Sequence, residues 1–228
     1  MKGYEYILRN VETVRERMAR ACDVAGRSAD DVALCAVVKM RTPEEIAAVL
    51  EAGVGIIGEN RVREAADRAP FLKGGFEYHF IGHVQTNKAA QVAEMFGTVQ
   101  SVDSQRVAES LSREAGKRNK TLAIYLQVNS SGEETKSGLE SGEFMEAAER
   151  ISVLDHLALR GVMTIGPLTD DEAAIRKSFK MTRELYEALK KHHPGASVLS
   201  MGMTDDLEIA IQEGATLLRV GRALFERR

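Results

Sequence analysis

The stretch ALCAVVKMRTPEEIAAVLEAGVGIIG, residues 33–58, contains the unit from which the fold is built. An apolar run, ALCAVV, is followed by a segment with helical signals and then by a second apolar run, GIIG. Thr42 offers a capping hydroxyl, Pro43 suits the first helical turn, and Gly53 suits a helix end. A strand, a helix and another strand in this order predict one βα unit of a parallel sheet.

The same alternation repeats along the chain. Eight short apolar runs occur, at residues 33–38, 55–58, 77–81, 98–102, 121–128, 158–163, 197–200 and 216–220. Their first residues are 22, 22, 21, 23, 37, 39 and 19 apart, and most of these intervals suit one strand, one helix and two short loops. We therefore predict an α/β fold consisting of a single (β/α)8 barrel of the TIM type. An open doubly wound sheet is the alternative, and eight similar units favour closure.

Residues 1–27 predict an extra helix before the first strand. Apolar side chains recur at spacings of three and four from Tyr4 to Met18, and Gly26 suits the helix end. After the last apolar run and the Gly221 and Arg222 that follow it, only residues 223–228 remain, which are too few for a full helix. We expect the N-terminal helix to take that place on the barrel. No linker divides the chain, so we expect residues 1–228 to form one domain.

Composition and charge exclude several classes of protein. Lys and Arg total 31 against 34 for Asp and Glu, so a net charge of −3 provides no basic field for nucleic acid or an anionic membrane. No apolar run approaches the about 20 residues of a membrane-spanning helix. The two cysteines, Cys22 and Cys35, cannot form a disulfide framework, and the charged N-terminus lacks the apolar core of a signal peptide. We expect a cytoplasmic protein.

Polar residues follow the predicted strands, at the end of a barrel where functional sites are built. Lys39 shares strand alternation with Cys35 and Val37, so we expect its amine to point into the barrel mouth. There, partial desolvation and the neighbouring charge of Arg41 would favour the neutral amine, which is the nucleophile for a Schiff base with an aldehyde. The alternative is a lysine that reaches solvent from the strand end.

The segment SMGMTDD, residues 200–206 with its glycine at position 202, joins the seventh predicted strand to a helix through a small turn. Its backbone N–H groups, with the hydroxyls of Ser200 and Thr204, could hold a phosphate near the helix start. TIM-type barrels often bind phosphate with the loops after strands seven and eight, and Gly221 provides a close backbone approach after the eighth. The alternative is that Thr204 only caps the helix.

Arg219 lies between Leu218 and Val220 in an otherwise apolar strand. A charge in such a place is costly unless it is paired or bound to a ligand, which makes Arg219 a candidate ligand-binding residue. An internal ion pair is the alternative. We expect His79 and the pair at 192–193 to be solvated, and no spacing of His, Cys and acidic residues predicts a metal site.

A lysine after the first strand, a phosphate turn after the seventh and an arginine in the eighth together resemble the pyridoxal phosphate homeostasis protein family, whose barrel is like the N-terminal domain of alanine racemase. The resemblance covers nearly the whole chain. It is carried by the ordered segments AVVKMRTPEEI (36–46), GENRVREA (58–65), EYHFIGHVQTNK (77–88), VNSSGEETKSG (128–138), LRGVMTIGP (159–167), LSMGMTDD (199–206) and LLRVGRALF (217–225). The sequence departs from the family pattern at Val38 and Met40, where the family often has a serine and a threonine.

The resemblance implies roles for particular residues toward pyridoxal 5′-phosphate (PLP). Lys39 would carry the cofactor as a Schiff base, the internal aldimine. Arg219 would face the ring nitrogen or lie beside the phosphate, and an arginine at that nitrogen weakens the ring as an electron sink. The residues that would cradle the phosphate are Ser200, Gly202, Met203, Thr204, Gly221 and Arg222. The residues that would line the two faces of the cofactor are Asn60 and His83 on one side and Met163 with Thr164 on the other.

The resemblance also implies a function. It suggests a cytoplasmic monomer that stores, buffers or delivers PLP without substantial catalysis, with apo forms of PLP-dependent enzymes as partners. Lys136 matches a second family lysine suspected of receiving or passing on the cofactor, and a solvated loop lysine is the alternative.

Two enzymatic functions are the alternatives to a homeostasis role. One is a PLP-dependent amino-acid racemase or decarboxylase. Racemisation needs a second base, which in alanine racemases is a tyrosine of a separate domain, and none of the five tyrosines here follows a predicted strand. The other is a barrel enzyme that acts on a phosphorylated metabolite without PLP, which would leave Lys39 and Arg219 together unexplained.

Overall fold

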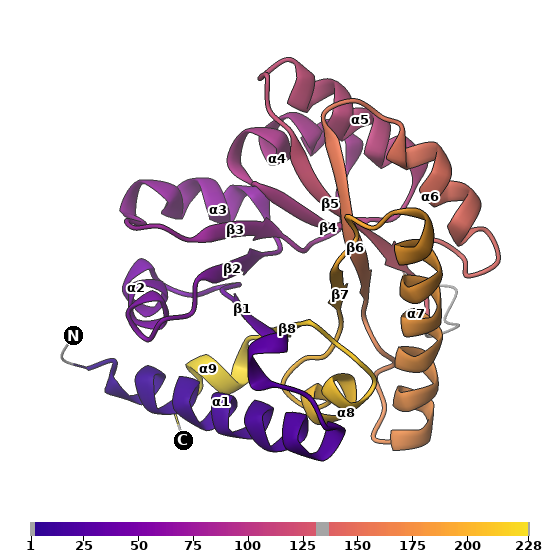
Figure 1. Ribbon diagram of the computed structural model, residues 1–228. Helices are drawn as coiled ribbons and strands as arrows, with labels where there is room; N and C mark the ends of the chain where they lie inside the picture. Colours follow the sequence, from indigo (N-terminus) through magenta and orange to yellow (C-terminus); the bar gives the residue numbers. More distant parts are fainter. Residues whose placement is uncertain (1–2, 131–136, 228) are drawn as a thin grey trace.

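Eight parallel strands close into a barrel at the centre of the molecule (Figure 1). The computed structural model describes residues 3–130 and 137–227. Each strand pairs with the next along the chain, and the first pairs with the eighth. The strands are β1 (Ala33–Val37), β2 (Ile56–Glu59), β3 (Glu77–Phe80), β4 (Thr98–Val102), β5 (Leu122–Val128), β6 (Leu157–Thr164), β7 (Val198–Ser200) and β8 (Leu217–Val220). This topology confirms the predicted (β/α)8 barrel over the open doubly wound sheet.

The strands coincide with the apolar runs of the sequence to within one residue at each end. Parallel strands that are covered by helices are buried on both faces, so their sequences are apolar almost without alternation. Strand β5, with the sequence LAIYLQV, illustrates this. The polar side chains inside such strands are therefore buried, and we expect them to have hydrogen-bond partners inside the protein.

A ring of helices covers the outside of the barrel (Figure 1). They are α1 (Glu5–Ala25), α2 (Pro43–Glu51), α3 (Val62–Arg68), α4 (Ala89–Met95), α5 (Gln105–Gly116), α6 (Phe144–Ser152), α7 (Glu172–His192), α8 (Leu207–Gln212) and α9 (Arg222–Phe225), with short 3-10 turns at Ala29–Asp31, Ala69–Phe71 and Thr86–Lys88. Helix α2 begins as predicted, since Thr42 Oγ1 accepts a hydrogen bond from Glu45 N–H at 3.2 Å. None of the helices in the described ranges is long and apolar enough to cross a membrane.

The N-terminal helix α1 fills the place left by the short last helix. It packs against α8 and α9, and Figure 1 shows its indigo ribbon beside the yellow C-terminal elements. The Asn10 side chain donates hydrogen bonds to the carbonyls of Leu224 and Glu226, at 3.2 and 2.9 Å. The expectation of an extra helix on the barrel is therefore confirmed.

Apolar side chains pack in two places. The main core lies between the strands and the helices, and its largest fully buried side chains include Phe96, Phe144 and Phe179. A smaller cluster contains Cys35, Tyr125, Met163 and Leu217, from four different strands. Because neighbouring strand residues belong to the main core, this second cluster fills the barrel interior.

Candidate cofactor-binding site

The candidate site lies where the carboxyl ends of the strands meet. A cavity of about 210 Å³ is present there, and its lining residues include Asn60, Gly82, His83, Gln127, Asn129 and Ile165. These residues end or follow β2, β3, β5 and β6, which is the edge of a TIM-type barrel where loops build functional sites. In the described parts of the chain no cluster of three His, Cys, Asp or Glu side chains could hold a metal ion.

Lys39 follows β1 at this same end of the barrel. It lies in a four-residue turn closed by a 3.0 Å hydrogen bond from Arg41 N–H to the Val38 carbonyl. Because β1 pairs with β2 and β8, the turn lies between the carboxyl ends of those strands. The Lys39 residue is exposed, so the partial desolvation expected for its amine is not present in this structure.

Arg219 is buried near the mouth, with 4% of its surface exposed. Its guanidinium donates to the Ser200 hydroxyl at 2.7 Å and to the Thr164 carbonyl at 2.6 Å. Burial lowers the pKa of Arg219 to about 10, and the groups of Cys35 and Asp206 oppose that effect. No carboxylate within the described ranges forms an ion pair with Arg219. Two neutral oxygens, of Ser200 and Thr164, bind its guanidinium instead.

A chain of hydrogen bonds runs from Arg219 through the barrel interior. Ser200 Oγ, which accepts from Arg219, donates to Gln100 Oε1 at 2.7 Å. Gln100 Nε2 lies 2.8 Å from His79 Nδ1, and His79 Nε2 lies 3.0 Å from a carboxylate oxygen of Glu77. The chain connects β8, β7, β4 and β3, and it ends at an exposed carboxylate on the first residue of β3. It therefore joins the mouth to the opposite end of the barrel.

The prediction that the His79 side chain is solvated is wrong. It is 1% exposed and lies in the interior between Gln100 and Glu77. We assign its proton to Nε2, because that nitrogen faces a carboxylate, which can only accept. Nδ1 of the neutral ring then accepts from Gln100. Gln100, like Arg219, is a polar residue inside one of the strand-like runs, so the sequence offered the same signal for it.

The two turns that follow β7 and β8 lie against each other. Thr204 Oγ1 accepts a hydrogen bond from Ala223 N–H at 3.3 Å, and Arg222 forms an ion pair with Asp205. Thr204 therefore connects the two turns, and its side chain does not cap α8, whose N-cap residue is Asp206. Gly202 has a φ of 94°, and a Cβ atom there would lie 2.5 Å from Ala210 Cβ, so this turn requires glycine.

Two residues expected in the phosphate cradle have other partners in this structure. The Ser200 hydroxyl is fully buried and binds Gln100 and Arg219. Met203 N–H donates to Asp206 at 2.6 Å. Burial raises the pKa of the Asp206 carboxyl, while the hydrogen bond from Met203 lowers it. Ser200 thus orients Arg219, and Asp206 occupies a backbone donor of the turn.

The remaining predicted residues lie on different sides of the site. Asn60 Oδ1 is buried and has no hydrogen-bond partner among the residues that the structure describes. His83 is exposed, and its Nδ1 lies 3.0 Å from Asp103 at the end of β4. Met163 is fully buried in the barrel interior. Lys136 falls in the segment 131–136, outside the described residues.

Comparison with known proteins gives the family. Residues 9–227 match the family model described as alanine racemase, N-terminal domain. The pyridoxal phosphate homeostasis protein of Pasteurella multocida strain Pm70 is 37% identical over 224 residues, which cover 96% of each chain. That of Escherichia coli K12 is 35% identical over 226 residues, which cover 96% of this chain and 95% of the relative. The chain belongs to the pyridoxal phosphate homeostasis protein family.

Solved structures of similar proteins agree with this family. PipY of Synechococcus elongatus PCC7942, solved with PLP bound, is 32% identical with a TM-score of 0.81, and the match covers 93% of this chain and 100% of PipY. Alanine racemase of Corynebacterium glutamicum is 14% identical with a TM-score of 0.76, covering 99% of this chain and 61% of the racemase. The second likeness concerns the fold alone.

The residues present fit the cofactor named in this family. Asn60 Oδ1 is a buried acceptor without a partner among the described residues, at the wall of the mouth cavity. The turn at Gly202 packs tightly against Ala210 and Leu218, which holds its backbone in one place at the end of β7. With Lys39 at the end of β1 and Arg219 below the mouth, the site offers an amine, a cation and two joined turns at one end of the barrel.

Proposed function

We propose that the protein binds PLP through a Schiff base on Lys39 and serves PLP homeostasis. The observation that carries the proposal is the common location of Lys39, the buried Arg219 guanidinium and the two joined turns at one end of the barrel. The names of relatives at 35–37% identity and the PLP bound to PipY support it.

The chemistry of attachment follows from the residues. The neutral amine of Lys39 attacks the aldehyde carbon of PLP, two protons leave the nitrogen with the aldehyde oxygen as water, and a C=N bond forms. The turns containing Gly202, Thr204 and Gly221 would hold the phosphate. Arg222 would complete this cradle, together with Met203 once its N–H leaves Asp206, and Asn60, His83 and Met163 would border the ring.

Arg219 supports a role without substantial catalysis. PLP supplies an electron sink to enzymes when its ring nitrogen is protonated, and a guanidinium at that nitrogen opposes the protonation. Ser200 and the Thr164 carbonyl hold the Arg219 guanidinium in one orientation. We therefore infer storage, buffering or delivery of PLP by a cytoplasmic, single-domain monomer, with apo PLP-dependent enzymes as recipients and Lys136 as a second lysine for transfer.

The test of binding uses borohydride. Wild-type protein mixed with PLP should absorb visible light, and reduction of the C=N bond should fix the cofactor on the peptide that contains Lys39. Lys39→Ala should lose both signals, whereas Lys190→Ala, an exposed lysine in the last turn of α7, should keep them. Unchanged absorbance and trapping in Lys39→Ala would reject the assignment.

The same loaded protein tests the absence of catalysis. Incubation with amino acids in deuterated water should leave the α-proton in place, as followed by NMR. Exchange at about 1 per second or faster, an enzyme-like turnover, would establish a racemase-type function instead.

A further inference from the structure

The turn that carries Lys39 has an unusual backbone. Met40, the next residue, has a φ of 59°, which a side chain other than glycine adopts only at a cost. With the hydrogen bond from Arg41 N–H to the Val38 carbonyl, a positive φ at the third position is the pattern of a type II turn. The other described non-glycine residues with positive φ, Asn119 and His156, precede strands β5 and β6 at the opposite end of the barrel.

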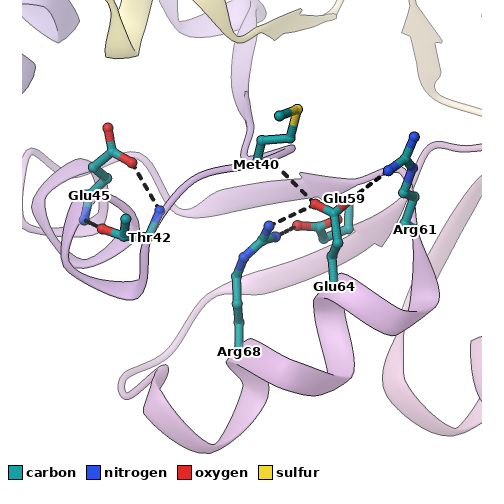
Figure 2. Close-up of polar contacts among 7 residues, drawn as sticks. All are labelled: Met40, Thr42, Glu45, Glu59, Arg61, Glu64 and Arg68. Carbon is teal, nitrogen blue, oxygen red and sulfur yellow. Dashed lines mark hydrogen bonds and ion pairs between the residues drawn. The ribbon is translucent and has the colours of Figure 1, made fainter.

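The Met40 side chain does not explain this conformation. It is 75% exposed, so its packing contributes little to holding the backbone. The holding contact is instead a hydrogen bond of 3.1 Å from Met40 N–H to a carboxylate oxygen of Glu64. Glu64 lies on α3, in the following βα unit, and Figure 2 shows its carboxylate directed toward the turn.

Glu64 is itself held by two arginines. Arg68 donates to the same carboxylate oxygen at 2.7 Å, and Arg61 donates to the other oxygen at 3.2 Å. Arg68 is also paired with Glu59, a fully buried carboxylate that ends β2 (Figure 2). A line of contacts therefore runs from Glu59 in the barrel wall through Arg68 and Glu64 to the backbone N–H of Met40, the residue after Lys39.

Charge and burial favour this arrangement of Glu59, Glu64 and Arg68. Partial burial acts to raise the pKa of the Glu64 carboxyl, but the bonds from Met40 and Arg68 lower it below its ordinary value. Burial raises the pKa of Glu59, and Arg68 opposes that rise. Because a buried charge that loses its partner is costly, the pairs of Arg68 with Glu59 and Glu64 stabilise this arrangement.

We propose that Glu64 is a positioning residue, which holds Met40 in the left-handed conformation and thereby directs the Lys39 amine toward its aldehyde. This inference rests on the proposed function of Lys39. It predicts that Glu64 affects the formation of the C=N bond more than the binding of the rest of the cofactor, because only the former needs the amine in place.

Two ligands separate these effects. PLP forms the C=N bond, whereas pyridoxine 5′-phosphate has the same ring and phosphate with an alcohol in place of the aldehyde. In Glu64→Ala we expect formation of the C=N bond to be about tenfold weaker by absorbance titration, in line with the cost of an unsupported left-handed residue. Binding of pyridoxine 5′-phosphate, measured by calorimetry, should change less than about twofold.

Three further variants act as controls. Glu45→Ala removes a carboxylate in the first turn of α2 that contacts Thr42 N–H and Arg41 but not Met40, and it should lower thermal stability but leave C=N formation unchanged. Glu64→Gln keeps an acceptor oxygen and should lose less than Glu64→Ala. In a Met40→Gly background, Glu64→Ala should have almost no effect, because glycine adopts positive φ without support.

The outcomes distinguish the two proposals. If wild-type protein fails to trap PLP on Lys39, the proposed function fails. If wild-type protein traps PLP and Glu64→Ala does so equally well, only the positioning role is wrong. Equal losses for PLP and pyridoxine 5′-phosphate, or no rescue by Met40→Gly, would also overturn the positioning role, since they indicate a general disturbance of the site.

Discussion

At the scale of single residues, the interior of the barrel contains a hydrogen-bond chain with one direction. Arg219 donates to Ser200, Ser200 to Gln100, Gln100 to His79, and His79 to the Glu77 carboxylate. Every donor faces an acceptor only when His79 is neutral, because a protonated ring has no acceptor for Gln100. Protonation of His79 would therefore break its hydrogen bond with Gln100, and Gln100 in turn holds Ser200, the partner of Arg219.

The pH dependence of stability tests this chain. Burial lowers the pKa of His79, although Glu77 opposes the shift, whereas in the unfolded chain the pKa of His79 has its ordinary value of about 6.5. Below that pH the unfolded state binds more protons, so stability should fall as the pH drops, by at most about 1.4 kcal/mol per pH unit. Urea unfolding at several pH values between 7.5 and 5 should show this loss in the wild type.

Two variants identify the group responsible. His79→Gln should remove this part of the pH dependence, while His192→Gln, at the exposed end of α7, should keep it. A wild-type slope in His79→Gln would mean that other groups determine the pH dependence. The comparison of variants is essential because Glu59 and Asp206, whose pKa values are raised by burial, act in the opposite direction.

At the scale of elements, the turn after β7 depends on Gly202. A Cβ atom there would lie 2.5 Å from Ala210 Cβ and 2.8 Å from Leu218 Cδ2, and its φ is 94°. We expect Gly202→Ala to lower the free energy of unfolding by about 2–4 kcal/mol through overpacking and left-handed strain. It should also weaken PLP binding, since the turn must move away from β8.

Gly142→Ala is the matched control for this substitution. Gly142 has no neighbour within 4 Å of an added Cβ atom and no positive φ. Its substitution should leave both stability and PLP binding near the wild-type values. A stable Gly202→Ala protein with normal PLP affinity would show that the turn has room that the structure does not indicate.

The elements also show what the sequence can predict. The strands were predictable because burial on both faces makes most of them apolar, and the run at 121–128 coincides with β5 to within one residue. The presence of Arg219 inside such a run correctly marked an interior charge. The partners of that charge were not predictable, because which polar side chains meet inside a barrel depends on the stagger of strands that are distant in sequence.

The contacts beside Lys39 illustrate the same limit. Glu59, Glu64 and Arg68 are close in sequence, but their function depends on a turn in the preceding βα unit. No local pattern indicates that Met40 has a positive φ, since methionine is not a residue that favours it. Likewise, the alternation that pointed Lys39 into the mouth did not predict its exposure, because the side chain leaves the strand in a turn.

At the scale of the whole molecule, α1 connects the start of the chain with the proposed phosphate turn. Arg17 forms a bidentate pair with Glu208 of α8, with N–O distances of 2.7 and 2.8 Å. The same guanidinium donates to the Thr204 carbonyl at 2.9 Å. The helix that completes the ring of the barrel therefore also contacts the proposed phosphate turn, and we expect Arg17 to couple closure of the fold to ligand binding.

This coupling predicts that a change on the outside of the barrel weakens binding at its mouth. Arg17→Met should lower the free energy of unfolding by about 1 kcal/mol, a modest value because Glu208 is 40% exposed. It should also weaken PLP binding several-fold, because Thr204 loses a contact that fixes its backbone. Arg20→Met is the control, since Arg20 pairs with Glu16 at 3.8 Å on the exposed face of α1. Calorimetry on both variants decides the matter: if they bind PLP equally well, α1 completes the barrel without supporting the turn.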